Sequence, residues 1–265
     1  MTIGTIEMKS NLIEKLRLLI KSVFIIRNWY LYPLVYYGLI KREHIIFVMR
    51  NGVKIKLRTK STDLMAFTHV WLIEEYSKPG FEIRSEDIIL DVGAHIGLFS
   101  LFASQFCKTG KIYCFEPIKE NYNLLLTNLQ LNNLRNVIPL NAAVSNKTSA
   151  VTIFLNEDES GHSMYSSTSR AVQVESVTLQ KIFEDNNISK CNLLKLDCEG
   201  AEYDIINTMS INDVNKINRM IIEYHFADSK PELLENLVKR LTNFAYSISK
   251  KILFSDIGFL YVTKQ

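Results

Sequence analysis

The segment Asp91-Val92-Gly93-Ala94-His95-Ile96-Gly97 follows directly after the apolar run Ile88-Ile89-Leu90. An apolar run, an acidic residue, two glycines and a new apolar periodicity predict a strand, a tight turn and a helix. Chains turn in this way at the carboxyl end of a parallel strand, where a nucleotide-like ligand can approach the backbone. The segment therefore predicts an α/β fold with a ligand site at the turn.

Expected strands and helices alternate from Asp87 onward, which predicts a parallel, doubly wound sheet. Two β-prone runs, 244–253 and 258–263, then predict a closing antiparallel hairpin. This ending is typical of a Rossmann-like class I methyltransferase, whose seven-stranded, mostly parallel sheet has an antiparallel last strand, and not of dinucleotide dehydrogenases. The expected strands are 87–92, 111–116, 137–141, 192–197 and 219–224, and the expected helices are 96–106, 119–131, one from about 201, and 230–243.

Residues 143–177 interrupt this alternation. We expect them to be irregular except for an apolar piece at 151–155 and a strand over 171–177, with a helix over 179–186 after them. The stretch 156–170 is rich in Ser, Gly and acidic residues. It has two interpretations, a mobile lid over an acceptor or a plain surface loop.

The bulk properties are those of an ordinary globular protein. The 265 residues can hold one large α/β domain with a smaller flank, and 47% of them are hydrophobic. A net charge of +3 is too small to indicate nucleic-acid binding by itself. The four cysteines form no CxxC pair, which favours a reduced, cytoplasmic protein.

Residues 10–42 are rich in aliphatic and aromatic residues and carry six basic residues against one acid. Arg27, Asn28 and Pro33 interrupt the apolar run, so a transmembrane span is not favoured. Two interpretations remain for the expected helix. It packs on the domain, or it makes a peripheral contact with a membrane surface through its apolar and basic side chains.

The pair Asn51-Gly52 divides residues 44–57 into two alternating runs and predicts a β-hairpin. The apolar spacing over 64–78 predicts a helix that leads up to Pro79-Gly80. We therefore expect an N-terminal flank of hydrophobic basic helix and hairpin over residues 1–60, and a methyltransferase domain over 61–265.

Glu116 ends the second expected strand, about 19 residues after Gly97, near the offset of a ribose-binding carboxylate. Its two oxygens can accept hydrogen bonds from the paired ribose hydroxyls. The turn reads G-x-x-x-G and lacks the G-x-G-x-x-G spacing that brings backbone against a pyrophosphate, and Asp91 would repel that anion. S-adenosylmethionine carries no phosphate and is positively charged at sulfur and nitrogen, so it is favoured over NAD.

Three acids, Asp197, Glu199 and Glu202, follow the strand expected over 192–197. In a doubly wound sheet this strand borders the first one, so the acids face the same crevice. They could hold the sulfonium side of the cofactor, bind a divalent metal or deprotonate an acceptor hydroxyl. The alternative for one of the glutamates is a favourable interaction with the helix dipole.

His225 directly follows the strand expected over 219–224, and the acidic residue Glu223 lies two positions before it. This place predicts a substrate-side or base role, although a lone histidine is more often structural. His95, inside the glycine turn, is expected to bond backbone or to line the pocket.

The chain resembles the FkbM family of S-adenosylmethionine-dependent methyltransferases. The resemblance covers roughly residues 60–226, and its most specific part is Lys-x-Asp-x-Glu-Gly-x-Glu at 195–202; the family commonly has Asn in place of His95. The matching stretches are Asp91–Ser100, Phe115-Glu116-Pro117, Asn141-Ala142-Ala143-Val144 and Leu194–Tyr203.

The resemblance implies methyl transfer to an oxygen, often a hydroxyl of a sugar or natural product. By the same resemblance, Asp91, Gly93 and Gly97 would hold the methionine moiety, and Ala94 in the same turn is also expected to bind the cofactor. Glu116 would hold the ribose. The remaining assignments are Asn141 and Ala142 beside the adenine and Asp197 facing the transferred methyl.

Together, the residues favour an O-methyltransferase that aligns an acceptor hydroxyl with the methyl–sulfur bond. The expected acceptor is a sugar, glycan or other small molecule. The hydroxyl must lose a proton, and the candidate bases are Asp197, Glu199 and His225. A divalent metal is possible but not favoured.

Three other functions stay open. A nucleic-acid methyltransferase is disfavoured because the chain lacks both a dense basic face and the Asn/Asp-Pro-Pro-aromatic segment of base-nitrogen enzymes. An NAD-dependent oxidoreductase is disfavoured by the glycine spacing and the closing hairpin. A non-catalytic cofactor- or partner-binding module on the same fold is disfavoured by the intact acids Asp91, Glu116 and Asp197.

Overall fold

The computed structural model describes residues 12–154 and 171–265. Its contacts divide the chain into two compact units, Met1–Glu75 and Tyr76–Gln265. This division falls later than the limit expected between residues 60 and 61, and that domain limit stays a prediction.

The N-terminal unit contains the expected hairpin. Its strands β1 (His44–Val48) and β2 (Lys54–Arg58) pair antiparallel, and Gly52 in the turn has φ +95°, a conformation that glycine adopts without strain. Phe47 and Phe67 are fully buried and pack ring against ring at the centre of the unit.

Two helix expectations in this unit are wrong in their bounds. The single helix expected within 10–42 is two, α1 (Leu12–Ile25) and α2 (Leu31–Tyr36), because the chain between them pairs with β1 through Arg27 N–H to Val48 O and the Asn28 side chain. The helix expected over 64–78 consists of α3 (Asp63–Phe67) and the π-helix η1 (Thr68–Ile73). It ends there because Glu74 adopts a left-handed φ of +60°.

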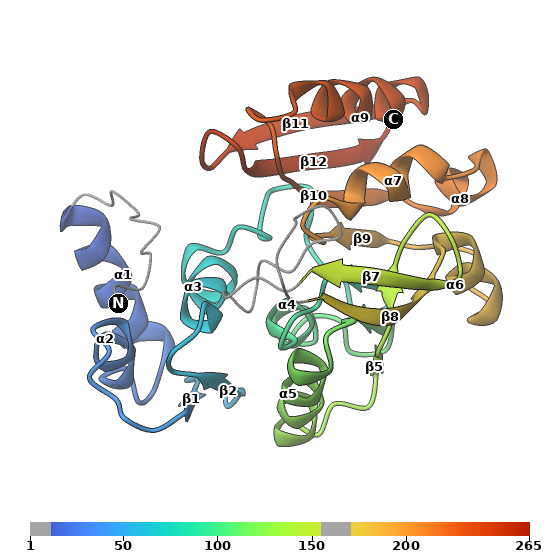
Figure 1. Cartoon of the computed structure of the whole chain (residues 1–265). Helices are drawn as coiled ribbons and strands as arrows, with labels where there is room; N and C mark the ends of the chain where they lie inside the picture. The colour runs from blue at the N-terminus through green and yellow to red at the C-terminus, as the bar shows by residue number, and fades with distance from the viewer. Residues whose placement is uncertain (1–11, 155–170) are drawn as a thin grey trace. The chain divides into compact units, whose positions relative to one another are not determined.

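The second unit is built on a seven-stranded sheet with the order β11-β12-β10-β9-β3-β4-β5. Six strands run parallel, and β12 is antiparallel to both neighbours, where the closing hairpin inserts it beside β10 (Figure 1). This confirms the Rossmann-like class I methyltransferase fold. The strands are β3 (Ile88–Val92), β4 (Lys111–Phe115), β5 (Val137–Leu140), β9 (Leu193–Leu196), β10 (Arg219–Tyr224), β11 (Tyr246–Ile252) and β12 (Gly258–Lys264).

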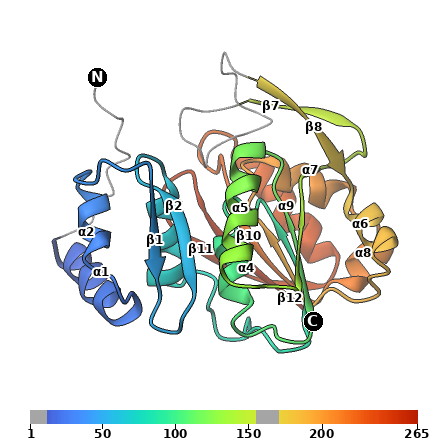
Figure 2. The same ribbon diagram turned by 90° about the horizontal axis from the view of Figure 1, so that it is seen from below.

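Helices cover both faces of this sheet (Figure 2). Successive residues of β3 point to opposite faces: Leu90 and Val92 pack into the core with α6, α7 and α9, whereas Asp91 points to α4 and bonds Ser100. Both α4 and α8 depart from expectation, since α4 is shorter than 96–106 and α8, with its Ser210–Asp213 capping box, was not predicted. The helices are α4 (Leu98–Ala103), α5 (Lys119–Leu131), α6 (Leu179–Asp185), α7 (Ala201–Thr208), α8 (Ile211–Lys216) and α9 (Pro231–Asn243).

Residues 143–177 are more regular than expected where the structure describes them. The strands β6 (Ala143–Val144), β7 (Ala150–Phe154) and β8 (Ala171–Val177) form a separate three-stranded sheet in the order β6-β8-β7. Alternation explains it, because Val151 and Ile153 both bury their side chains in a small cluster with Ile118. The lid-or-loop stretch 156–170 lies outside the described residues.

Two further expectations bear on the chain as a whole. All four cysteines are free thiols, and three of them are buried. Within residues 12–154 and 171–265, no helix is both long and apolar enough to cross a bilayer.

Candidate active site

The glycine turn after β3 lies between the ends of β4 and β9. The N–H groups of Gly93 and Ala94 both donate to Phe115 O, at 3.1 and 2.9 Å. Gly93 has φ +76°, and a Cβ placed there would come within 1.7 Å of Asp197 O. Only glycine therefore fits at this position, which holds the turn close against the end of β9.

Glu116 ties the same turn to the end of β4. Its carboxylate accepts hydrogen bonds from the backbone N–H of His95 at 2.8 Å and of Ile118 at 2.9 Å. Burial raises the pKa of Glu116 to about 7, against these hydrogen bonds, which lower it. The carboxylate thus lies at the turn, and its assignment to ribose stays a prediction.

Asn141 and Ala142 follow β5 at the same edge of the sheet. The Asn141 amide donates to Glu116 O at 2.8 Å and to Pro117 O at 3.0 Å, so it holds the backbone on which Glu116 stands. Its side chain is exposed, and Ala142 is half-buried. His95 is half-buried with φ +51°, a left-handed conformation that Asn, Asp and His adopt more readily than most residues.

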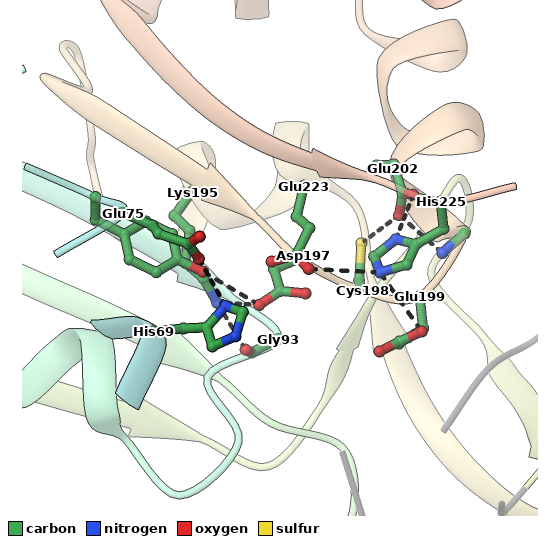
Figure 3. A network of polar contacts seen from close by, with 12 residues as sticks. His69, Glu75, Gly93, Lys195, Asp197, Cys198, Glu199, Glu202, Glu223 and His225 are labelled. Atoms are coloured by element: carbon green, nitrogen blue, oxygen red, sulfur yellow. Dashed lines mark hydrogen bonds and ion pairs between the residues drawn. The ribbon is translucent and has the colours of Figure 1, made fainter. Parts of the chain in front are cut away.

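Lys195 also belongs to this site, although we expected no role for it from the sequence. Its ammonium lies 3.3 Å from Asp197 Oδ2 and donates to Gly93 O at 2.8 Å (Figure 3). The same ammonium lies 3.1 Å from Asp91 Oδ1. Burial alone would lower the pKa of Lys195, but Asp91 and then Asp197 raise it above its usual value. We call Asp91, Lys195 and Asp197 the lysine cluster; the signal for it was a lysine inside an otherwise apolar strand.

The lysine cluster changes the place expected for Asp91. This carboxylate is fully buried, where it accepts a hydrogen bond from the Ser100 hydroxyl at 2.7 Å and faces Lys195. Asp91 therefore contacts Lys195, and Lys195 in turn holds the glycine turn through Gly93 O. Asp197 is the open member: its side chain is 26% exposed, and it accepts a hydrogen bond from the Tyr76 hydroxyl at 3.4 Å.

A second group of charges surrounds His225, and we call Glu199, Glu202, Glu223 and His225 the histidine cluster. Figure 3 shows Glu202 and Glu199 on opposite sides of the His225 ring. Nδ1 lies 3.0 Å from Glu202 Oε1, and Nε2 lies 3.5 Å from Glu199 Oε2 and 3.9 Å from Glu223 Oε1.

Glu202 is the inner member of the histidine cluster. It is fully buried, and besides His225 it accepts hydrogen bonds from the Gly200 N–H at 2.9 Å and from the Cys198 thiol at 3.6 Å. The sequence suggested a helix-dipole interaction for one glutamate, and the contact with His225 was not foreseen. Glu202 is the second residue of α7, after Ala201. From this first turn of the helix its carboxylate contacts the His225 ring.

The charges of the histidine cluster do not balance. Burial raises the pKa of Glu199 to about 7, and burial together with Asp197 raises the pKa of Glu223 well above its usual value. Burial would lower the pKa of His225, but Glu202 and then Glu199 raise it well above its usual value. The pKa values of His225 and Glu199 are therefore both raised, and that of Glu199, about 7, lies close to neutral pH.

Glu199 also has an unusual backbone. Its φ is +52°, the left-handed region that side chains other than glycine rarely adopt, and Gly200 follows with φ +108°. Such strain costs about 1–3 kcal/mol and clusters at functional sites. It turns a 28% exposed side chain toward the crevice edge of the sheet.

Among the described residues, Asp197, Glu223 and His225 each offer one ligand atom, and these atoms lie within 4.8 Å of one another. Oxygen and imidazole ligands at this spacing suit a divalent cation. The expectation that a divalent metal is possible but not favoured stays a prediction.

The comparisons with known proteins agree with one another. The family described as Methyltransferase FkbM domain matches residues 91–248. The hexuronic acid methyltransferase AglP of Haloferax volcanii is 24% identical over 144 residues, which cover 54% of this chain and 58% of that protein. The 31-O-demethyl-FK506 methyltransferase FkbM of Streptomyces tacrolimicus is 22% identical over 184 residues, 58% of this chain and 71% of that protein.

Among solved structures, fibrillarin of Aeropyrum pernix with bound S-adenosylmethionine aligns with a TM-score of 0.47 and 12% identity, covering 84% of this chain and 94% of that one. The fold assignment depends on the strand order and the family match.

Proposed function

The chain belongs to the FkbM methyltransferase family, and on that premise we propose that it is an S-adenosylmethionine-dependent O-methyltransferase. The observation that best supports the proposal is a set of three carboxylates at one edge of the sheet. Glu116, Asp197 and Glu199 follow the parallel strands β4 and β9, which flank β3 and its glycine turn. In open α/β sheets, ligands bind at this edge.

The side chains at this edge of the sheet fit a cofactor that is positively charged and has no phosphate. Beside the glycine turn, the partly exposed carboxylate of Asp197 attracts a sulfonium or an ammonium and repels a phosphate. Gly93, Ala94 and Gly97 would bind the methionine part through the backbone, with Asp91 acting through Lys195. Glu116 would bind the ribose hydroxyls, and Asn141 and Ala142 would border the adenine.

S-adenosylmethionine would supply an electrophilic methyl group: the carbon–sulfur bond breaks, a carbon–oxygen bond forms at the acceptor, and the hydroxyl proton is released. We assign that proton to Glu199, whose pKa near 7 suits a general base at neutral pH. His225 would keep its own proton and orient Glu199 through Nε2. Asp197, already engaged by Lys195, would face the methyl group.

The acceptor we propose is a hydroxyl of a sugar, a glycan or another small molecule. Its support is the printed substrate class of the AglP relative, a hexuronic acid, together with the family membership of the chain. A hydroxyl is also the acceptor for which a base beside the methyl donor has a use, since its proton must leave as the ether forms.

Two measurements test the proposal. Calorimetry with S-adenosylmethionine, S-adenosylhomocysteine and NAD should show binding of the first two. Incubation with methyl-labelled S-adenosylmethionine and a panel of uronic acids, neutral sugars, glycans and RNA should place label in an ether-linked methyl group of a sugar or glycan. Binding of NAD without the methyl donor would overturn the cofactor assignment, and label recovered in RNA but in no sugar would overturn the acceptor class.

A further inference from the structure

The helix α1 carries a line of apolar side chains that residues 12–75 of its own unit leave exposed. Leu12, Leu16, Ile20 and Phe24 are 79%, 55%, 50% and 73% exposed. They recur every four residues, so they lie one above another along one face of the helix. Soluble surfaces rarely expose apolar groups in a continuous stripe of this kind, and such stripes mark interaction sites.

The stripe does not come from a helix that has lost its packing. On its other side α1 is seated in its own unit, because Ser22 and the following Ile26 are fully buried and Lys21 pairs with Glu74 of the same unit at 2.9 Å. The helix therefore has a packed inner face and an apolar outer face.

Aromatic residues continue the exposed surface around α2. Exposed side chains here are Trp29, Tyr30, Tyr36 and Tyr37. Lys15 of α1 lies 5.9 Å from the Tyr36 ring centroid, so the exposed residues of the two helices adjoin. Tryptophan and tyrosine are the residues enriched where a protein meets the headgroup region of a membrane. We call the outer faces of both helices the α1–α2 surface.

Charge separates this unit from the remainder of the chain. Residues 1–75 carry 12 Lys and Arg against 6 Asp and Glu, whereas residues 76–265 carry 19 against 22. Lys15, Arg17 and Arg27 are exposed beside the apolar stripe. A basic, apolar and aromatic surface is complementary to anionic lipid, since apolar burial and headgroup attraction then act together.

We propose that the α1–α2 surface binds the surface of an anionic lipid bilayer and holds the enzyme there. The 14 residues of α1 are about 21 Å long, shorter than the roughly 30 Å apolar core of a bilayer, so the helix lies in the interface and does not cross it. The proposal does not depend on the methyl transfer. It limits acceptors in the cell to those presented at a membrane.

The test is flotation of the full-length protein with phosphatidylcholine vesicles, with and without phosphatidylglycerol. The wild type should float with the anionic vesicles, less so at high salt. The variant Leu16→Ser/Ile20→Ser/Phe24→Ser should lose this binding by about tenfold or more. A matched control, Ile211→Ser/Ile252→Ser/Phe254→Ser, removes exposed apolar side chains of the other unit and should float like the wild type.

Light scattering and calorimetry complete the test. Both variants should keep the wild-type affinity for S-adenosylmethionine, which separates this proposal from that of the function. A wild type that fails to float with anionic vesicles overturns the proposal. A concentration-dependent dimer that the stripe variant abolishes, without vesicle binding, would assign the surface to a second copy of the chain and overturn it as well.

Discussion

The lysine cluster and the histidine cluster lie at the ends of neighbouring strands, yet they balance charge in opposite ways. Lys195 stands between Asp91 and Asp197 and also holds Gly93 O, so every member has a close partner of opposite charge or a hydrogen bond. In the second cluster one imidazole, that of His225, faces three glutamates, whose oxygens lie 3.0, 3.5 and 3.9 Å from its ring nitrogens. The first cluster is a fixed support, and the second contains Glu199, whose pKa burial raises to about 7.

This difference in charge balance separates the residues that support the site from those that perform its chemistry. A buried, paired charge stabilises one geometry and is costly to disturb. A carboxyl whose pKa lies near the working pH can take up and release a proton. Substitutions in the two clusters should therefore affect different quantities, stability in the first and turnover in the second.

The largest effect is expected from Lys195→Met. Removing one partner of a buried ion pair leaves Asp91 charged without compensation, which costs about 3–5 kcal/mol of unfolding free energy. Urea unfolding followed by circular dichroism measures it. Asp91→Asn combined with Lys195→Met should recover part of the loss, and a single Lys195→Met variant as stable as the wild type would remove the lysine cluster from its supporting role.

The variant Glu199→Gln should lower kcat about 10²–10⁴-fold, because the amide cannot accept the acceptor proton. Affinity for S-adenosylmethionine should stay close to that of the wild type, and so should the unfolding free energy at pH 5. Glu235→Gln, an exposed site on α9, serves as the matched control. Unchanged kcat in Glu199→Gln would move the base role to Asp197 or His225.

Much of this division could not be predicted from the sequence, although the fold could. The runs over 119–131 and 219–224 gave α5 and β10 with their observed bounds, because periodicity and local turn signals agree there. The sequence also brought Glu116, Asp197, Glu199 and His225 to one edge of the sheet.

The partners of these residues escaped prediction for a physical reason. Lys195 reaches β3, and Glu202 reaches back to His225, which is 23 positions away in sequence. Side-chain direction decides both contacts, and linear spacing does not encode it. The predicted end of the helix expected over 64–78 was wrong for a similar reason. Glu74 adopts a left-handed conformation without being a glycine, so the sequence carries no signal for the helix end there.

A smaller effect, about tenfold in kcat, is expected from Glu202→Gln. The amide oxygen still accepts the hydrogen bond from His225 but no longer stabilises its charge, so the pKa of His225 falls. The pH–rate profile should change shape along with kcat, whereas a purely structural role would change stability alone. An unaltered profile would separate Glu202 from the proton chemistry.

The last effect concerns pH and stability. Burial raises the pKa of Glu199 from 4.5 to about 7, so the stability that its protonated form provides is present below pH 4.5 and is lost as pH rises through about 7. Relative to the wild type, Glu199→Gln should thus be more stable at pH 8 than at pH 5. Equal differences at both pH values would contradict the raised pKa.

The central claim is that the glycine-turn side of the site binds the methyl donor while the histidine cluster handles the proton. Calorimetry of S-adenosylmethionine binding to Glu116→Ala and to Glu199→Gln, each first shown to be folded by thermal unfolding, tests it most directly. We expect Glu116→Ala to weaken binding by about tenfold or more, through the loss of charged hydrogen bonds to ribose, and Glu199→Gln to bind like the wild type. Wild-type affinity in Glu116→Ala, or an equal loss in both variants, would contradict the account.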